Sequence, residues 1–474
     1  MSVLSGLEPE KVFKYFEEIS MIPRGSGHTQ KIAQYCMDFA AARALDAFCD
    51  ESYNVTVFKG GSPGRENEAP VILQGHTDMV WEKEPGSDFD FENSPLRLKI
   101  EGDYISAHGT TLGGDDGAAV AICLALLDSS DISHPPLEVV FTSDEEIGMV
   151  GAFAYDAGRL RGKRMINLDS EAEDVLWVSC AGGARADIEL PCVTRANPFD
   201  SYIIKISNLH GGHSGAEIDK GYANASVLMG RLLKALSDKY EIFISGVDGG
   251  AMDNAITREC TAVVCASGNI APVIEKYADI FAAECVNDPG LTLDARRVNS
   301  PVCFDRESSD NIISMLSSFP CGVISMSKDI DGLVQTSLNL GITKTDMSGV
   351  SFSFLVRSSV NAEKEKLLDD LRSIASKYGA SISVSGNYPA WEFNPESSLR
   401  KTMIGAYKRL FGKELKTAAI HAGLECGLFC GKIEGLDCVS IGPDMYDIHT
   451  PRERLSISSL KRVYDYLTET LKNI

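Results

Sequence analysis

Three polar clusters in the first part of the chain could bind metal ions or transfer protons. Each cluster lies at or shortly after the end of a short apolar run. The clusters are His76-Thr77-Asp78 after Val71–Leu73, Asp144-Glu145-Glu146 after Leu137–Phe141, and Asp169-Ser170-Glu171 after Met165–Leu168. Imidazole and carboxylate groups are common metal ligands, and a carboxylate beside a ligand can act as a general base. Two further candidates are Asp115, which follows GTTLGG, and His449 in SIGPDMYDIHTPRE.

Each of these residues also has an ordinary structural explanation. Asp115 and Asp116 could cap the helix that begins beside them, and three acids in a row could form a surface turn. The hypothesis of a site therefore depends on convergence of the clusters. Two histidines and at least three carboxylates would hold two divalent ions, with one carboxylate bridging them. Mixed nitrogen and oxygen ligands suit Zn, Mn or Co better than Ca or Mg.

An α/β sheet would bring the clusters together. Apolar runs that are buried on both faces are typical of parallel strands, and they alternate here with an almost wholly apolar helix at 115–127. Another helix is indicated at 8–20 by apolar residues at helical spacing. Ligands of such sheets bind beyond the carboxyl ends of the strands, which is where these polar clusters fall.

The section from 187 to 391 has a different pattern. Alternating strands such as 202–206 mix with amphipathic helices, which predicts an α+β arrangement with one solvated face. The helices are expected near 222–238, 271–285 and 362–378. The α/β pattern then returns, with helices near 397–411 and 457–472 and strands at 418–420 and 439–441. We therefore expect a catalytic α/β domain formed by residues 1–186 and 392–474, interrupted by an inserted domain of residues 187–391.

The composition excludes some classes of partner. The chain has 474 residues, with 45 Lys and Arg against 67 Asp and Glu, which gives a formal net charge of −22. This charge argues against binding to nucleic acid or to an anionic membrane surface. The N-terminus has no signal-peptide pattern, and no apolar run is long enough to span a membrane. The 13 scattered cysteines predict free thiols and a cytoplasmic location.

The motifs resemble one family closely. They are HTDMV, GTTLGGDDG, TSDEEIGMVGA, NLDSE, CAGG, GGHSG, HAGLECGL and SIGP…IHTP, and they run in order from residue 76 to 451. These blocks resemble those of the aminoacylhistidine dipeptidases, the Xaa-His dipeptidase or peptidase D branch of the co-catalytic zinc peptidases. That larger group includes the carnosinases and aminoacylases. HAGLECG and GGHSG are the blocks most specific to this branch.

The resemblance implies a zinc-peptidase-like catalytic domain, with a mixed sheet between helices, interrupted by a large α+β lid and dimerisation domain. It also implies a set of metal ligands: His76, Asp115, Glu146, Asp169 and His449. Asp115 would bridge two divalent ions, for which Zn is favoured and Mn or Co are alternatives. His76 and Asp169 would hold one ion, and Glu146 and His449 the other. Glu145 would be the general base, and Asp78 would orient His76.

Other residues are implied on the substrate side. His213 of GGHSG would donate to the oxyanion, from its own or a neighbouring subunit. Asn254 and Arg357 would bind the substrate carboxylate, and His421 and Glu425 of HAGLECG lie on the substrate side, with Glu425 able to pair with a free amino terminus. One departure from the resemblance is Asp116, where relatives often have Asn.

The expected activity is metal-dependent hydrolysis of dipeptides with a free amino terminus, of the Xaa-His type and others, by a homodimer. The same site would also suit an N-acyl-amino-acid deacylase or a tripeptidase. A non-catalytic binding protein is a third alternative, against which the intact Glu145 beside a full ligand set argues. Nucleophilic Cys or Ser chemistry has little support, because no Cys-His pair is implied by the spacing.

Overall fold

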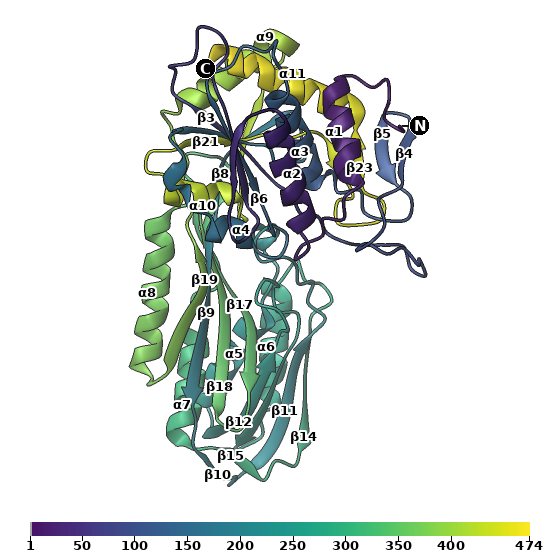
Figure 1. The fold of residues 1–474 in the computed structure, drawn as a ribbon. Coiled ribbons are helices and arrows are strands. Elements are labelled where there is room, and N and C mark those ends of the chain that lie inside the picture. Colours follow the sequence, from purple (N-terminus) through teal and green to yellow (C-terminus); the bar gives the residue numbers. More distant parts are fainter. Residues whose placement is uncertain (1) are drawn as a thin grey trace. The chain divides into compact units, whose positions relative to one another are not determined.

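The computed structural model describes residues 2–474, which divide into two compact units. Unit 1 comprises residues 2–179, 393–419 and 424–474, and unit 2 comprises residues 180–392 and 420–423. The mixed α/β architecture predicted from the sequence is confirmed (Figure 1).

An eight-stranded mixed sheet forms the centre of unit 1, in the order β1-β2-β6-β3-β7-β21-β8-β20. Its strands are β1 (Asp46–Cys49), β2 (Val55–Lys59), β3 (Val71–His76), β6 (Leu137–Thr142), β7 (Arg164–Asn167), β8 (Val175–Cys180), β20 (Lys416–Ile420) and β21 (Asp437–Ser440). The neighbouring strands β6, β3, β7 and β21 are parallel. Every residue of β3 and β6 is buried, which explains the apolar runs Val71–Leu73 and Val139–Phe141 within them.

Helices cover this sheet. They are α1 (Glu10–Ser20), α2 (Gln30–Ala42), α3 (Gly114–Leu127), α4 (Val150–Ala154), α9 (Ser398–Phe411), α10 (Glu425–Lys432) and α11 (Ile457–Asn473), with the short 3-10 helix η1 (Ala157–Arg159). Helix α3 is buried along its whole length because it packs on both β3 and α1, whereas α9 and α10 pack on β21. A small sheet in the order β22-β23-β5-β4 completes the unit: β4 (Leu98–Glu101), β5 (Tyr104–Ala107), β22 (Met445–Tyr446) and β23 (Arg454–Ser456).

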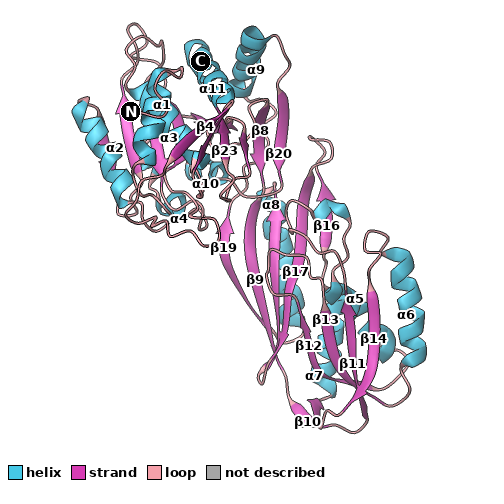
Figure 2. Ribbon diagram, turned by 90° about the vertical axis from the view of Figure 1, so that its right-hand side faces the viewer, coloured by secondary structure: helices cyan, strands magenta, loops and turns pink. Residues whose placement is uncertain are grey.

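Unit 2 is built on a nine-stranded antiparallel sheet in the order β14-β11-β13-β12-β17-β18-β9-β19, with β16 also paired to β17 (Figure 2). The strands are β9 (Gly182–Pro191), β11 (Asp200–Ser207), β12 (Ile242–Gly249), β13 (Cys260–Ala266), β14 (Thr292–Val298), β16 (Gly322–Met326), β17 (Val334–Thr345), β18 (Gly349–Ser358) and β19 (Ser381–Tyr388). A separate pair is formed by β10 (Thr194–Ala196) and β15 (Val302–Phe304).

The helices of unit 2 supply the other half of its core. They are α5 (Ala225–Ser237), α6 (Ala271–Glu284), α7 (Arg306–Ser318) and α8 (Asn361–Lys377), with the short 3-10 helix η2 (Ile218–Lys220). Leu232 and Leu368 of the helices belong to one apolar cluster with Ile204 and Phe354 of the strands. The alternation of buried and exposed residues predicted for this section is seen at the end of β9, where Ile188 and Leu190 are buried and Glu189 and Pro191 are exposed.

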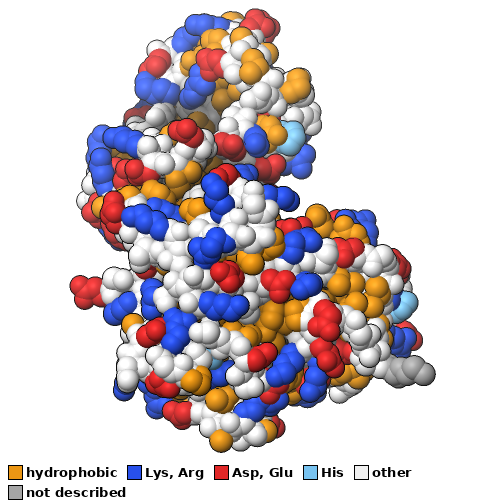
Figure 3. Space-filling view, turned by 90° about the horizontal axis from the view of Figure 1, so that it is seen from above, with side chains coloured by type: hydrophobic (Ala, Val, Ile, Leu, Met, Phe, Trp, Pro, Cys, Tyr) orange, Lys and Arg blue, Asp and Glu red, His pale blue; other side chains and the backbone are white. Residues whose placement is uncertain are grey.

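Charged side chains of both signs lie on the surface. On the face in Figure 3, Lys and Arg side chains lie among the Asp and Glu side chains. The excess of acids therefore does not exclude local ion pairs, of which Arg43 with Asp128 is one example, at 2.6 Å. Among residues 2–474, no helix combines the length and the apolar character needed to cross a membrane.

Candidate metal centre

The parallel strands of unit 1 deliver the predicted ligands to one edge of the sheet. His76 is the last residue of β3, Asp169 lies two residues beyond the end of β7, and Glu146 lies four residues beyond the end of β6. Parallel strands end at the same edge, so side chains that follow them converge there. Asp115 reaches this edge from the start of α3, and His449 from the loop between β22 and β23.

Asp115 lies at the centre of the cluster. Its Oδ1 lies 3.1 Å from Nε2 of His76, and its Oδ2 lies 3.2 Å from Nε2 of His449. The same nitrogen of His449 is 2.9 Å from Oε1 of Glu146, and that of His76 is 3.5 Å from Oδ1 of Asp169. One carboxylate thus faces two imidazoles through different oxygens, which is the arrangement that two neighbouring cations with a shared ligand would require.

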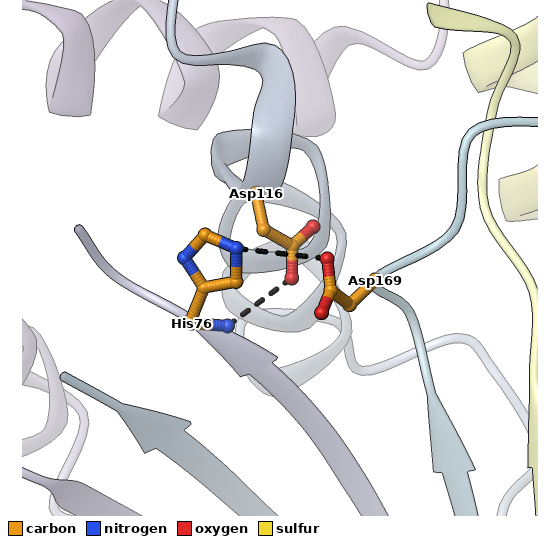
Figure 4. A group of neighbouring side chains, drawn as sticks. All are labelled: His76, Asp116 and Asp169. Atoms are coloured by element: carbon orange, nitrogen blue, oxygen red, sulfur yellow. Dashed lines mark hydrogen bonds and ion pairs between the residues drawn. The ribbon is translucent and has the colours of Figure 1, made fainter. Parts of the chain in front are cut away.

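Asp116 also joins the cluster, although no ligand role was predicted for it. Figure 4 shows its carboxylate beside His76 and Asp169. Oδ2 of Asp116 accepts a hydrogen bond from the backbone N–H of His76 at 3.1 Å. Donor atoms of these three residues lie within 4.8 Å of one another, as do those of His76, Asp115 and Glu146. Burial, together with the charges of Asp169 and Asp115, raises the pKa of Asp116 well above its usual range.

Asp78 contacts both His76 and the turn that carries Glu145 and Glu146. Its Oδ1 lies 3.4 Å from Nδ1 of His76, which also contacts the carbonyl oxygen of Asp78 at 3.2 Å. The two carboxylate oxygens accept the backbone N–H groups of Glu145, at 3.0 Å, and Glu146, at 3.3 Å. Asp78 therefore contacts the imidazole of His76 and holds the turn that carries two of the acids.

The electrostatics of the cluster favour a bound cation. Burial raises the pKa of Glu145 well above its usual range, and the nearby charges of Asp169 and Glu425 act in the same direction. Hydrogen bonds to Asp115 and Glu146 raise the pKa of His449 to about 10. Burial acts to raise the pKa of Asp115, but hydrogen bonds from His449 and His76 outweigh this effect, so the pKa is lowered overall. Such crowding of buried carboxylates is costly without positive charge, so the donor set fits divalent metal ions.

Sequence reasoning missed Arg24, which is fully buried under the cluster. Its Nη1 donates to the carbonyl oxygens of Thr77, at 2.9 Å, and Asp78, at 3.1 Å, and its Nη2 donates to that of Gly113. Arg24 thereby connects the segment after His76 to the segment before Asp115. A single Arg in a loop has no sequence pattern that would have indicated this role.

A second predicted cluster lies in unit 2. A methyl group added at Gly215 would lie 3.0 Å from Cε1 of His213, 3.2 Å from Nε of Arg357 and 2.7 Å from the carbonyl oxygen of His421, so these residues meet around Gly215. Asn254 is nearby, because its carbonyl oxygen accepts the backbone N–H of Ser214 at 2.8 Å. The four residues predicted for the substrate side in this unit therefore lie together.

The hydrogen bonds of His213 assign its tautomer. Backbone N–H groups of Gly215, at 3.2 Å, and Ala216, at 3.0 Å, donate to Nδ1, so this nitrogen accepts and the proton is on Nε2. Burial lowers the pKa of His213, and the charge of Arg357 lowers it further. The ring is therefore a neutral donor through Nε2 near neutral pH.

Glu425, the fifth residue predicted on the substrate side, lies in unit 1. It is fully buried at the start of α10, where its Oε2 accepts hydrogen bonds from Gln74 and from Thr142. Its Oε1 has no hydrogen-bond partner within residues 2–474. Burial raises the pKa of Glu425 to about 7.

A carboxylate-centred ligand cluster at the carboxyl edge of an α/β sheet, in a chain with a second antiparallel unit, is the arrangement expected of a co-catalytic metallopeptidase. The chain belongs to peptidase family M20/M25/M40, whose model matches residues 72–473. It is 34% identical to the cytosol non-specific dipeptidase of Escherichia coli (strain K12), over 100% of this chain and 99% of that protein.

Solved structures agree with this assignment. The aminoacylhistidine dipeptidase from Vibrio alginolyticus matches with a TM-score of 0.94 and 34% identity, covering 99% of this chain and 98% of that one. A tripeptidase from Staphylococcus aureus shares the fold at a TM-score of 0.57 and 16% identity, with 98% of both chains covered. The resemblance stated from the sequence motifs is confirmed.

Proposed function

We propose that the protein hydrolyses dipeptides with a free amino terminus, of the Xaa-His type and others. The observation that carries this proposal is the Asp115 carboxylate, which faces His76 and His449 through different oxygens, with Glu145 on the adjoining turn. The names of the two relatives at 34% identity, a non-specific dipeptidase and an aminoacylhistidine dipeptidase, support this choice of substrate.

We assign two divalent ions to the cluster, with Zn favoured over Mn or Co. His76 and Asp169 would hold one ion, Glu146 and His449 the other, and Asp115 both. A pair of such ions supplies Lewis acidity, which lowers the pKa of water and polarises the substrate carbonyl.

Glu145 is the proposed general base. It would take a proton from the attacking water and return it to the leaving amine, while Asp78 fixes the turn that carries it. His213 would donate its Nε2 proton to the developing oxyanion, which suits the tautomer set by its backbone partners.

Arg357 and Asn254 are proposed to bind the substrate carboxylate, with His421 beside them. Nε of Arg357 is buried and has no hydrogen-bond partner within residues 2–474, so a donor remains for a ligand. Glu425 is proposed to receive the substrate amino group through Oε1. Oε1 of Glu425 is buried and has no hydrogen-bond partner within residues 2–474, so an acceptor remains for that group.

The remaining parts of the proposal concern assembly and location. Residues 1–186 and 392–474 would act as the catalytic domain, and residues 187–391 as a lid and dimerisation domain. We propose a cytoplasmic homodimer, in keeping with the word cytosol in the name of the Escherichia coli relative.

Metal analysis combined with a substrate panel tests the proposal. The purified protein should contain close to two divalent ions per chain, and it should hydrolyse Xaa-His, β-alanyl-His or Gly-Gly-type dipeptides. Faster cleavage of acetylated amino acids or of tripeptides would favour the deacylase or tripeptidase alternative. Absence of hydrolysis of all these substrates after supply of Zn, Mn or Co would refute the proposed peptidase function.

A further inference from the structure

Glu453 binds the backbone that presents Asp115. The side chain is 2% exposed. Its Oε2 accepts the N–H groups of Leu112, at 2.7 Å, and Gly113, at 3.0 Å, and its Oε1 accepts those of Gly114, at 2.7 Å, and Asp115, at 3.4 Å. Four consecutive backbone donors thus point at one carboxylate.

The local backbone makes this possible. Gly113 has a left-handed conformation, with φ at 66°, and Asp115 is outside the helical region, with φ at −82° and ψ at 108°. The N–H groups of residues 112–115 therefore turn towards one point, forming a concave anion site of the kind called a nest. A side chain at Gly113 would collide with Arg24, whose Nη2 lies 2.5 Å from the added Cβ position.

Arg24 holds the other side of the same loop. It donates to the carbonyl oxygen of Gly113 and to those of Thr77 and Asp78. The loop before Asp115 is therefore fixed through its N–H groups by Glu453 and through a carbonyl group by Arg24. Arg24 also holds the segment that follows His76.

Glu453 also belongs to the segment that carries His449. Its backbone N–H donates to the carbonyl oxygen of Thr450 at 3.0 Å, which closes a turn directly after the histidine. Glu453, which binds the loop at 112–115, is thus four residues from His449, which faces Oδ2 of Asp115. The two segments are far apart in the sequence.

We propose that Glu453 is a positioning residue that sets the spacing of Asp115 and His449, and thereby the affinity of the site they share for a divalent ion. This inference depends on the metal centre assigned under the proposed function. Glu453 does not face the cluster itself, because both of its oxygens are engaged by the backbone.

Glu453→Gln is the decisive variant. The amide replaces an acceptor with a donor, which would oppose a backbone N–H group, so the loop before Asp115 should shift. Loss of such a supporting contact typically weakens metal affinity by about 10–100-fold. The matched control is Glu138→Gln, because Glu138 on β6 is 4% exposed and likewise accepts backbone N–H groups, from Arg161 at 3.0 Å and Gly162 at 2.9 Å.

The test titrates Co²⁺ into the metal-stripped full-length protein and records the absorption spectrum, together with thermal unfolding of the metal-free forms. We expect Glu453→Gln to bind Co²⁺ at least about 10-fold more weakly, with an altered spectrum, whereas Glu138→Gln binds as the unsubstituted protein does. Equal affinity and an unchanged spectrum in Glu453→Gln would overturn the inference, even if both variants unfold at lower temperature.

A second variant covers the case in which Glu453→Gln does not fold. Glu453→Asp keeps the charge but is one methylene shorter, so it should also weaken Co²⁺ binding, and normal binding would overturn the inference. Failure of the unsubstituted protein to bind Co²⁺ would instead refute the metal centre and the proposed function. Normal Co²⁺ binding by that protein and by both Glu453 variants would refute only the positioning role.

Discussion

The two polar clusters differ in how their side chains are satisfied. In unit 1, the imidazoles of His76 and His449 contact carboxylates of the same cluster. In unit 2, Nε of Arg357 and Oγ of Ser214 are buried without any hydrogen-bond partner in residues 2–474. Buried polar groups are normally paired, so these unpaired donors remain available to a ligand. The side chains of the first cluster are paired with one another, whereas the second cluster has buried donors without a partner.

The charges of the two clusters are opposite as well. Burial and neighbouring carboxylates raise the pKa of Glu145 in unit 1, which favours binding of cations. Burial and the charge of Arg357 lower the pKa of His213 and of His421 in unit 2, which suits an anionic or oxygen-rich ligand. Variants of the two clusters should therefore fail in different ways, the first through metal binding or turnover and the second through substrate binding.

Loss of the shared carboxylate should have the largest effect. Asp115→Ala removes both oxygens that face His76 and His449. Because metal catalysis supplies several kcal/mol of transition-state stabilisation, turnover should fall on the order of 10⁴-fold. Metal analysis should show fewer than two ions per chain. A variant that retained both ions and normal turnover would contradict the sharing of Asp115.

Glu145→Gln should have the next largest effect. It should distinguish a role of Glu145 as general base from a role as metal ligand. The backbone hydrogen bond from residue 145 to Asp78 remains, so the turn and the proposed ligand Glu146 keep their positions. We expect metal content near normal and a turnover reduced by about 10²–10⁴-fold, the usual contribution of a general base. Loss of metal in parallel with turnover would show instead that Glu145 acts as a ligand.

Arg357→Met tests the cluster of unit 2. A charge-assisted hydrogen bond to a carboxylate contributes about 1.5–3 kcal/mol, so kcat/KM for dipeptides should fall by about 10–100-fold, chiefly through KM. Metal content should not change. Dipeptide amides, which lack the carboxylate, should be poor substrates of the unsubstituted protein and should lose little further in the variant. An equal loss for both substrates would contradict carboxylate binding by Arg357.

The contrast also explains what the sequence could predict. His76, Glu146 and Asp169 follow apolar parallel strands of unit 1, and parallel strands end at one edge, so their convergence was predictable. Arg24 and Glu453 act through backbone groups of a distant loop, whose conformation no spacing pattern indicates. Helix α10 was not predicted either, since its segment contains glycine, a poor helix former.

In unit 2, the helices near 225–237, 271–284 and 361–377 agree with the amphipathic patterns predicted for them. The meeting of His213, Arg357 and His421 around Gly215 had no such signal. These residues come from a loop, a strand and a short segment that returns to unit 2 after residue 419. Their grouping was implied only by the family resemblance, because it depends on long-range topology rather than on local spacing.

The smallest expected effect is a pH dependence of stability that belongs to unit 2. His421 is 7% exposed, and its Nε2 contacts Oγ of Ser337 at 2.7 Å. Burial, together with the charge of Arg357, lowers the pKa of His421 to about 4, while Asp219 and the carbonyl group of Val334 act in the opposite direction. In the unfolded chain the pKa returns to about 6.5, so between pH 6.5 and 4 the unfolded state binds a proton that the folded state does not.

Stability from this group is therefore present above pH 6.5 and is lost as the pH falls towards 4. Between pH 7 and pH 5 the unsubstituted protein should lose about 2 kcal/mol more free energy of unfolding than His421→Asn, as measured by urea denaturation of the metal-free forms. His210→Asn is the control, because His210 is an exposed histidine of the same unit, and it should behave as the unsubstituted protein does. If His421→Asn lost as much stability as the control over this range, His421 would be protonated in the folded state, and the cluster of unit 2 would carry one more positive charge than its contacts indicate.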